Sequence, residues 1–134
     1  GVTEYMPKKP LIAAIEGYAL AGGFELAISC DLIIAAETAK LGIPEVKRGL
    51  AAAAGGLCKL PKQIPYRIAM ELALTGDFIS AQRAMELGLI NQVVAEGQAG
   101  GRAGCSAGSS AGCAAAEGSA DGSAATAGRS AACP

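Results

Sequence analysis

Short apolar runs mark two strands in the first third of the chain. Residues 11–15 (LIAAI) and 32–36 (LIIAA) are wholly apolar, which is typical of strands that are buried on both faces of a sheet. A loop with glycines separates the first run from residues 24–30, which we predict to form a helix. A strand, a loop, a helix and a second strand within about 25 residues make a βαβ unit. We therefore predict parallel strands joined by a right-handed crossover.

The rest of the apolar pattern is mainly helical. Residues 55–64 and 65–75 fit two helices, and the second begins with a proline, a residue type favoured at the first helical position. Ser80 can cap a further helix that stops at Gly88, and we expect a last strand at 91–94. The predicted class is α/β, with parallel strands and with helices accumulating toward the C-terminal end.

Composition divides the chain after residue 98. Of the 36 residues from 99 to 134, 27 are Ala, Gly or Ser, and the segment has no Leu, Ile, Val, Met, Phe, Trp or Tyr. Such a segment has little to bury, whereas ordering each residue costs about 1–2 kcal/mol of backbone entropy. We predict a partial α/β domain at 1–98 and a disordered low-complexity tail at 99–134. With so few covering layers, we also expect an exposed apolar patch on the strands.

Charge and residue types exclude several classes of function. The 134 residues include 11 Lys and Arg, 12 Asp and Glu and no His, and the net charge is −1. This charge gives no basic field for nucleic acid, and the lack of His excludes Ser-His-Asp triads and most zinc sites. The five cysteines show no CxxC spacing, so we expect no metal site. Because the sequence shows no membrane-length apolar run and no secretory signal at its start, we expect a cytoplasmic protein that does not bind membranes.

Gly22 and Gly23 lie between the first strand and the following helix, as in the outline of a phosphate-binding loop. The Lys and Ser/Thr of such a loop are missing, and so is the G-x-G-x-x-G fingerprint of dinucleotide sites. A helix N-terminus cleared by glycines remains, and its N–H groups and dipole can stabilise a developing anion. The alternative is that the two glycines only let the strand and the helix pack closely.

Two glutamates are candidates for proton transfer. Glu25 lies in the first turn of the predicted helix, and Glu45 follows Pro44 in a turn. Each one alone is explained by a solvated carboxylate, since acidic residues favour helix N-termini. Together, beside an anion-binding helix end, they could divide general acid and general base work.

The stretch 12–32 (IAAIEGYALAGGFELAISCDL) resembles the signature of the enoyl-CoA hydratase/isomerase (crotonase) family along its whole length. Similar segments follow in the family's order and spacing: LGIPE at 41–45, AAGG at 53–56 and LTGDFISA at 74–81. The resemblance covers about residues 9–96 and implies a partial crotonase-like fold of repeated ββα units. It also implies that the chain corresponds to the central segment of the family's longer domain.

The resemblance further implies a lyase that adds water across the 2,3 double bond of a trans-2-enoyl-CoA in fatty-acid degradation. Glu25 and Glu45 fall on the two glutamates that hydratases use, and the backbone N–H of Gly22 falls on one donor to the thioester oxygen. The substrate itself carries coenzyme A, with no further cofactor or metal, and family members form homotrimers or hexamers. Two alternatives stay open: a truncated, catalytically inactive family fragment, or another reaction such as enoyl-CoA isomerisation.

Overall fold

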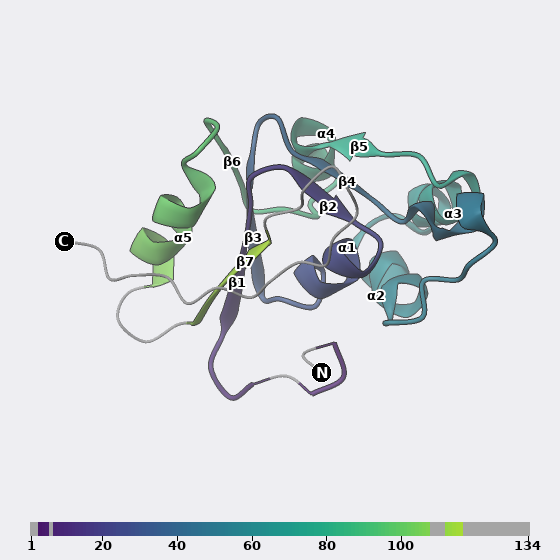
Figure 1. Ribbon diagram of the computed structural model, residues 1–134, viewed down its shortest axis with the longest axis horizontal. Helices are drawn as coiled ribbons and strands as arrows, with labels where there is room; N and C mark the ends of the chain where they lie inside the picture. Colours follow the sequence, from purple (N-terminus) through teal and green to yellow (C-terminus); the bar gives the residue numbers. More distant parts are fainter. Residues whose placement is uncertain (1–2, 6, 108–111, 117–134) are drawn as a thin grey trace.

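Figure 1 shows the computed structural model, which describes residues 3–5, 7–107 and 112–116. The strands are β1 (Leu11–Ile15), β2 (Tyr18–Leu20), β3 (Leu32–Ala36), β4 (Lys40–Gly42), β5 (Ile79–Ser80), β6 (Gln92–Val94) and β7 (Gly112–Ala116). The helices are α1 (Gly22–Ala27), the 3-10 helix η1 (Pro44–Arg48), α2 (Gly56–Gln63), α3 (Tyr66–Thr75), α4 (Ala81–Glu86) and α5 (Ala99–Ala107). No helix within these ranges is long and apolar enough to cross a membrane.

The strands form two sheets. The larger sheet has the order β6-β3-β1-β7, and all of its neighbouring strands are parallel. In the smaller sheet, β4 pairs with β2 in parallel and with β5 antiparallel. Along the chain, β1, β2 and α1 are followed by β3, β4 and η1, so the two-strands-then-helix unit repeats. The α/β class, the parallel strands and the ββα units are confirmed.

The predicted strands at 11–15 and 32–36 match β1 and β3 residue for residue. The helix predicted at 24–30 is shifted, because α1 begins at Gly22 and ends at Ala27. The loop predicted before it contains β2, a strand of three residues that is too short to show a hydrophobic period. Ala21 joins the two elements with a φ of 52°, a value that few residues other than glycine adopt.

The predicted helix ends are partly confirmed. Ser80 caps α4, because its hydroxyl oxygen accepts a hydrogen bond from the Arg83 N–H at 3.2 Å. Pro65 stands one position before α3, as its N-cap, and not at the first helical position. The helix predicted at 55–64 is α2, one residue shorter at each end.

Two apolar cores lie on opposite faces of the larger sheet. Side chains alternate between the faces of a strand, so Ala13 and Ile15 of β1 join the larger core with α1, α2, α3 and α4. Ile12 and Ala14 point to the other face and join Ala99 and Ala103 of α5. Figure 1 shows α5 on one side of β1 and β3 and the other helices on the opposite side. The expected exposed patch on these strands is therefore covered by α5.

The structure differs from the predicted disordered tail at α5 and at β7. Small side chains explain the helix, because Ala99 and Ala103 are both fully buried and let α5 lie close to the strands. β7 pairs with β1 in parallel along all five of its residues. The rest of the predicted tail, residues 108–111 and 117–134, lies outside the described residues.

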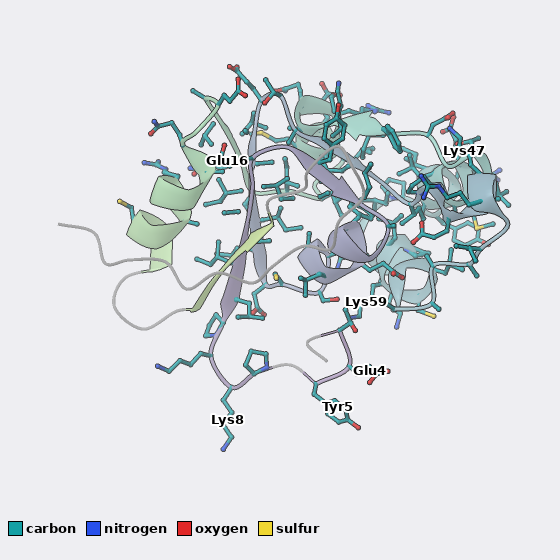
Figure 2. The ribbon with its side chains drawn as sticks, in the orientation of Figure 1. Glu4, Tyr5, Lys8, Glu16, Lys47 and Lys59 are labelled. Carbon is teal, nitrogen blue, oxygen red and sulfur yellow. The ribbon has the colours of Figure 1, made fainter. Side chains whose placement is uncertain are left out.

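A single carboxylate fixes the start of α5. Glu16 follows β1 directly, and its two oxygens accept hydrogen bonds from the N–H groups of Gly97 (2.8 Å), Ala99 (2.7 Å) and Gly100 (3.3 Å). Figure 2 shows Glu16 next to the beginning of this helix. A negative group at a helix N-terminus satisfies N–H groups that lack intrahelical partners and interacts favourably with the helix dipole.

We expect Glu16→Ala to lower the free energy of unfolding by about 1–2 kcal/mol, since it removes the cap of α5. Urea denaturation measures the change. The matched control is Glu37→Ala, at an exposed glutamate that follows β3, and it should shift the free energy by no more than about 0.5 kcal/mol. Equal effects of the two substitutions would show that the capping interaction contributes nothing.

Candidate active site

Glu25 is a buried carboxylate held by a helix N-terminus. It lies in the first turn of α1 and is 3% exposed. Its Oε1 accepts a hydrogen bond of 2.8 Å from the backbone N–H of Gly56, the first residue of α2. This N–H has no intrahelical partner, so the bond satisfies the donor and also compensates for taking the carboxylate out of water.

The approach of α2 to Glu25 requires glycine at position 56. A Cβ built on Gly56 would lie 2.9 Å from Glu25 Oε1, 3.0 Å from Glu25 Cγ and 3.3 Å from the Ala52 Cβ. Gly55, the N-cap residue, has a φ of 104°, which side chains rarely tolerate. Both glycines are thus needed to aim the Gly56 N–H at the carboxylate.

Glu45 lies in η1, directly after Pro44, and its side chain is half-buried. Its Oε2 is buried and has no hydrogen-bond partner among the residues that the structure describes. A buried carboxylate oxygen without a partner is costly, and such an atom calls for an explanation by a ligand or a water molecule. Glu45 is therefore not the solvated turn carboxylate of the simpler interpretation.

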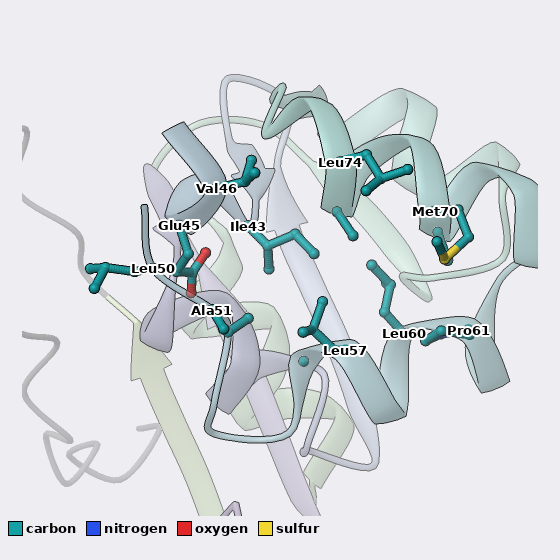
Figure 3. Close-up of a pocket in the computed structure, with 14 residues that line it drawn as sticks. Ile43, Glu45, Val46, Leu50, Ala51, Leu57, Leu60, Pro61, Met70 and Leu74 are labelled. Carbon is teal, nitrogen blue, oxygen red and sulfur yellow. The ribbon is translucent and has the colours of Figure 1, made fainter. Parts of the chain in front are cut away.

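A pocket of about 390 Å³ lies between η1, α2 and α3, within the size range of small-molecule sites. Figure 3 shows Glu45 near Leu50 and Ala51 at one end, with Pro61 and Met70 at the other. Glu45 is the single charged residue among the fourteen that line it: Ile43, Glu45, Val46, Leu50, Ala51, Ala52, Gly56, Leu57, Leu60, Pro61, Ala69, Met70, Ala73 and Leu74.

Gly56 is a neighbour of both predicted glutamates. This glycine lines the pocket together with Glu45, and its N–H binds the carboxylate of Glu25. Of the two carboxylates, Glu45 lines the pocket and has an unpartnered oxygen that can exchange a proton with a molecule bound there, whereas Glu25 lies behind Gly56 and is not among the lining residues.

Gly22 begins α1, three residues before Glu25. The backbone hydrogen bonds of this helix begin with the Glu25 N–H, which donates to the Ala21 carbonyl oxygen, so the N–H groups of Gly22 and Gly23 precede the first helical bond. A Cβ on either glycine would meet no atom within 4 Å. Close strand–helix packing therefore does not explain these two glycines, and space is open beside them.

Gly56 is the site residue that sequence reasoning missed. A signal was present, because Gly55 and Gly56 stand at the start of a helix just as Gly22 and Gly23 do. For a metal, the described part of the chain shows no group of three or more His, Cys, Asp or Glu side chains that could hold an ion.

A parallel α/β scaffold with one carboxylate in an apolar pocket, and a second, buried carboxylate bonded to the backbone of a residue that lines it, has the features of an acid–base site. The family model for enoyl-CoA hydratase/isomerase matches residues 4–103. The chain belongs to this family, as the resemblance implied, and the match extends into α5, beyond the segment that carried the resemblance.

Solved structures and curated proteins agree with this assignment. An enoyl-CoA hydratase from Mycobacterium tuberculosis H37Rv is 63% identical, with a TM-score of 0.74 over 75% of this chain and 40% of that chain. A carnitinyl-CoA hydratase from Mycobacterium avium is 48% identical, with a TM-score of 0.75 over 77% and 40%. A carnitinyl-CoA dehydratase from Salmonella paratyphi A is 43% identical over 99 residues, which are 73% of this chain and 38% of the relative. The chain thus spans about two fifths of the length of these relatives.

We expect Gly56→Ala to lower the free energy of unfolding by about 1–3 kcal/mol, because the added methyl group must displace Glu25 or the start of α2. The control Gly101→Ala places a methyl group in open space on α5 and should raise the free energy of unfolding by up to about 1 kcal/mol. Thermal unfolding of both variants measures the difference. A stable Gly56→Ala protein would mean that α2 does not approach Glu25 this closely.

Proposed function

We propose that this chain carries the acid–base site of an enoyl-CoA hydratase, which adds water across the 2,3 double bond of a trans-2-enoyl-CoA in fatty-acid degradation. The observation that carries the proposal is that Gly56, whose N–H binds the buried Glu25 carboxylate, lines the same apolar pocket as Glu45. The name of the Mycobacterium tuberculosis relative, at 63% identity, supports the same reaction.

The reaction needs two proton transfers and a place for negative charge. The oxygen of water forms a bond to C3, and a proton from that water passes to one carboxylate. The other glutamate, as a carboxylic acid, gives a proton to C2, so that one water molecule is added overall. Glu45 has an oxygen free to accept or donate, and Glu25 is fixed in direction, as general acid–base groups need to be.

Negative charge develops on the thioester oxygen as water adds, and we assign the Gly22 N–H as a donor to that oxygen. It stands at the positive end of α1 next to open space, where a carbonyl group can approach. Coenzyme A arrives as part of the substrate, so the proposed reaction uses no further cofactor. We also propose that the whole protein assembles as a homotrimer or a homohexamer, as the family resemblance implies.

The pocket favours a hydrocarbon acyl chain over a carnitinyl group. Its lining is aliphatic apart from Glu45, and none of the fourteen residues is aromatic. Proteins commonly bind quaternary ammonium groups, such as that of carnitine, in aromatic cages. We therefore place an enoyl thioester with an apolar acyl chain ahead of a carnitinyl thioester as the substrate.

The test uses residues 4–103 of this chain in place of the matching segment of the 63%-identical Mycobacterium tuberculosis enzyme. Hydration of crotonyl-CoA is followed by the loss of ultraviolet absorbance of the conjugated thioester. We expect activity in this chimaera, and a fall in kcat of about 10²–10⁴-fold for Glu25→Gln and for Glu45→Gln, because each substitution removes a proton-transfer group. Glu71→Gln, at an exposed glutamate on α3, is the control and should leave kcat unchanged.

Two further results bear on the assignment. The double variant should lose less activity than the product of the single losses, since residues that act as a unit are not additive. A chimaera that hydrates crotonyl-CoA and is indifferent to both substitutions would refute the roles of Glu25 and Glu45. Faster turnover of a carnitinyl thioester would refute the choice of substrate alone.

A further inference from the structure

We propose that Lys59 is a positioning residue that fixes the Glu25 carboxylate by clamping α2 against α1. The proposal rests on the proposed function in one respect only, the catalytic use of Glu25. Lys59 does not act on the substrate itself, because its hydrogen bonds run to Ser29 and to the N-terminal segment.

One stripe of α2 donates hydrogen bonds to α1 and the residues that follow it. Gly56, Lys59 and Gln63 are three and four positions apart, so they lie on the same face of α2. The Gly56 N–H binds Glu25 Oε1 at 2.8 Å, Lys59 Nζ binds Ser29 Oγ at 2.6 Å, and Gln63 Nε2 binds the Ile28 carbonyl oxygen at 2.8 Å. The clamp therefore includes the bond that holds the proposed catalytic carboxylate.

Lys59 connects more groups than the other two residues of the stripe. Besides Ser29, its ammonium group donates to the Thr3 carbonyl oxygen at 2.7 Å. Ser29 is 7% exposed, and its hydroxyl group in turn donates to the backbone oxygen of Glu25 at 2.6 Å. Lys59 thus reaches the backbone of Glu25 through one hydroxyl group, and Figure 2 shows it next to the N-terminal segment.

The aliphatic part of the Lys59 side chain packs beside Gly55, the residue that precedes α2. A Cβ on Gly55 would lie 3.3 Å from Lys59 Cε and 3.6 Å from Lys59 Cδ, so the side chain lies along the turn that presents the Gly56 N–H. A methionine at this position would keep the apolar stem but remove the ammonium donor.

The clamp is needed because the two helices are short. α1 has six residues and α2 has eight, and helices of this length are not stable by themselves in water. Their relative placement comes from tertiary contacts. Loss of the Lys59 bonds leaves Ser29 without its donor and frees α2 to move away from Glu25.

The first test is amide hydrogen exchange in the whole 134-residue chain. In Lys59→Met, we expect the protection of the Gly56 amide to fall about tenfold, the size of one net hydrogen bond, while the amides of β3 keep their protection. Lys59→Arg keeps the charge and the donors and should retain wild-type protection at Gly56. The control Lys62→Met, at an exposed lysine on the same helix, should leave the protection of the Gly56 amide unchanged.

Unchanged protection of the Gly56 amide in Lys59→Met would overturn the proposal. An equal loss of amide protection at Gly56 and in β3 would also overturn it, because such a loss indicates global destabilisation. If Lys59→Met does not fold, Ser29→Ala gives the same decision, because it removes the acceptor and keeps the lysine. In Ser29→Ala we expect the same selective loss of amide protection at Gly56. Unchanged protection of the Gly56 amide would overturn the proposal.

Activity provides the second readout. In the chimaera, Lys59→Met should lower kcat about 10- to 100-fold with little change in KM, because a misplaced catalytic group costs this much, and Lys59→Arg should restore the rate. A selective loss of Gly56 protection with unchanged hydration would overturn the claim that Lys59 positions Glu25 for catalysis, while the role of Glu25 itself is decided by Glu25→Gln. Unchanged protection with a lower kcat would refute the clamp and leave the proposed function intact.

Discussion

The hydrogen bond from the Gly56 N–H to Glu25 Oε1 organises the site. A carboxylate that is 3% exposed requires compensation, and a backbone donor at a helix N-terminus supplies it. Several features follow from this bond: Gly56 has no room for a side chain, Gly55 adopts a positive φ, and α2 must begin beside α1. The same glycine lines the pocket together with Glu45.

Two helices of this chain begin at a glutamate carboxylate that accepts hydrogen bonds from their first N–H groups. Glu25 binds the N-terminus of α2 across 31 positions of sequence, and Glu16 binds the N-terminus of α5 across more than 80. Each carboxylate comes from the first ββα unit and anchors a later helix. The first bond positions the proposed chemistry, whereas the second holds the alanines of α5 over the outer face of β1 and β3.

Local signals explain what the sequence could predict. β1 and β3 are continuous apolar runs, and the Ser80 cap and the region of α3 follow from residue types at fixed positions. β2 and β5 have only three and two residues, too few for a period to appear. The cap on α5 comes from a residue more than 80 positions away, and composition alone predicted no helix there. Glu25 and Glu45 could be named in advance, but the role of Gly56, which bonds Glu25 and lines the pocket with Glu45, is defined by distances in space.

The central claim is that Glu25 and the start of α2 are bonded to each other, and a through-hydrogen-bond coupling in the ¹⁵N,¹³C-labelled chain tests it most directly. Magnetisation passes between the Gly56 amide nitrogen and the Glu25 carboxyl carbon only when an intervening hydrogen bond joins them. At the 2.8 Å between Gly56 N and Glu25 Oε1, the account predicts a cross-peak that links these two nuclei. A Gly56 amide that shows no coupling to the Glu25 carboxyl carbon, in a chain whose β1 and β3 amides show the couplings of the parallel sheet, would contradict it.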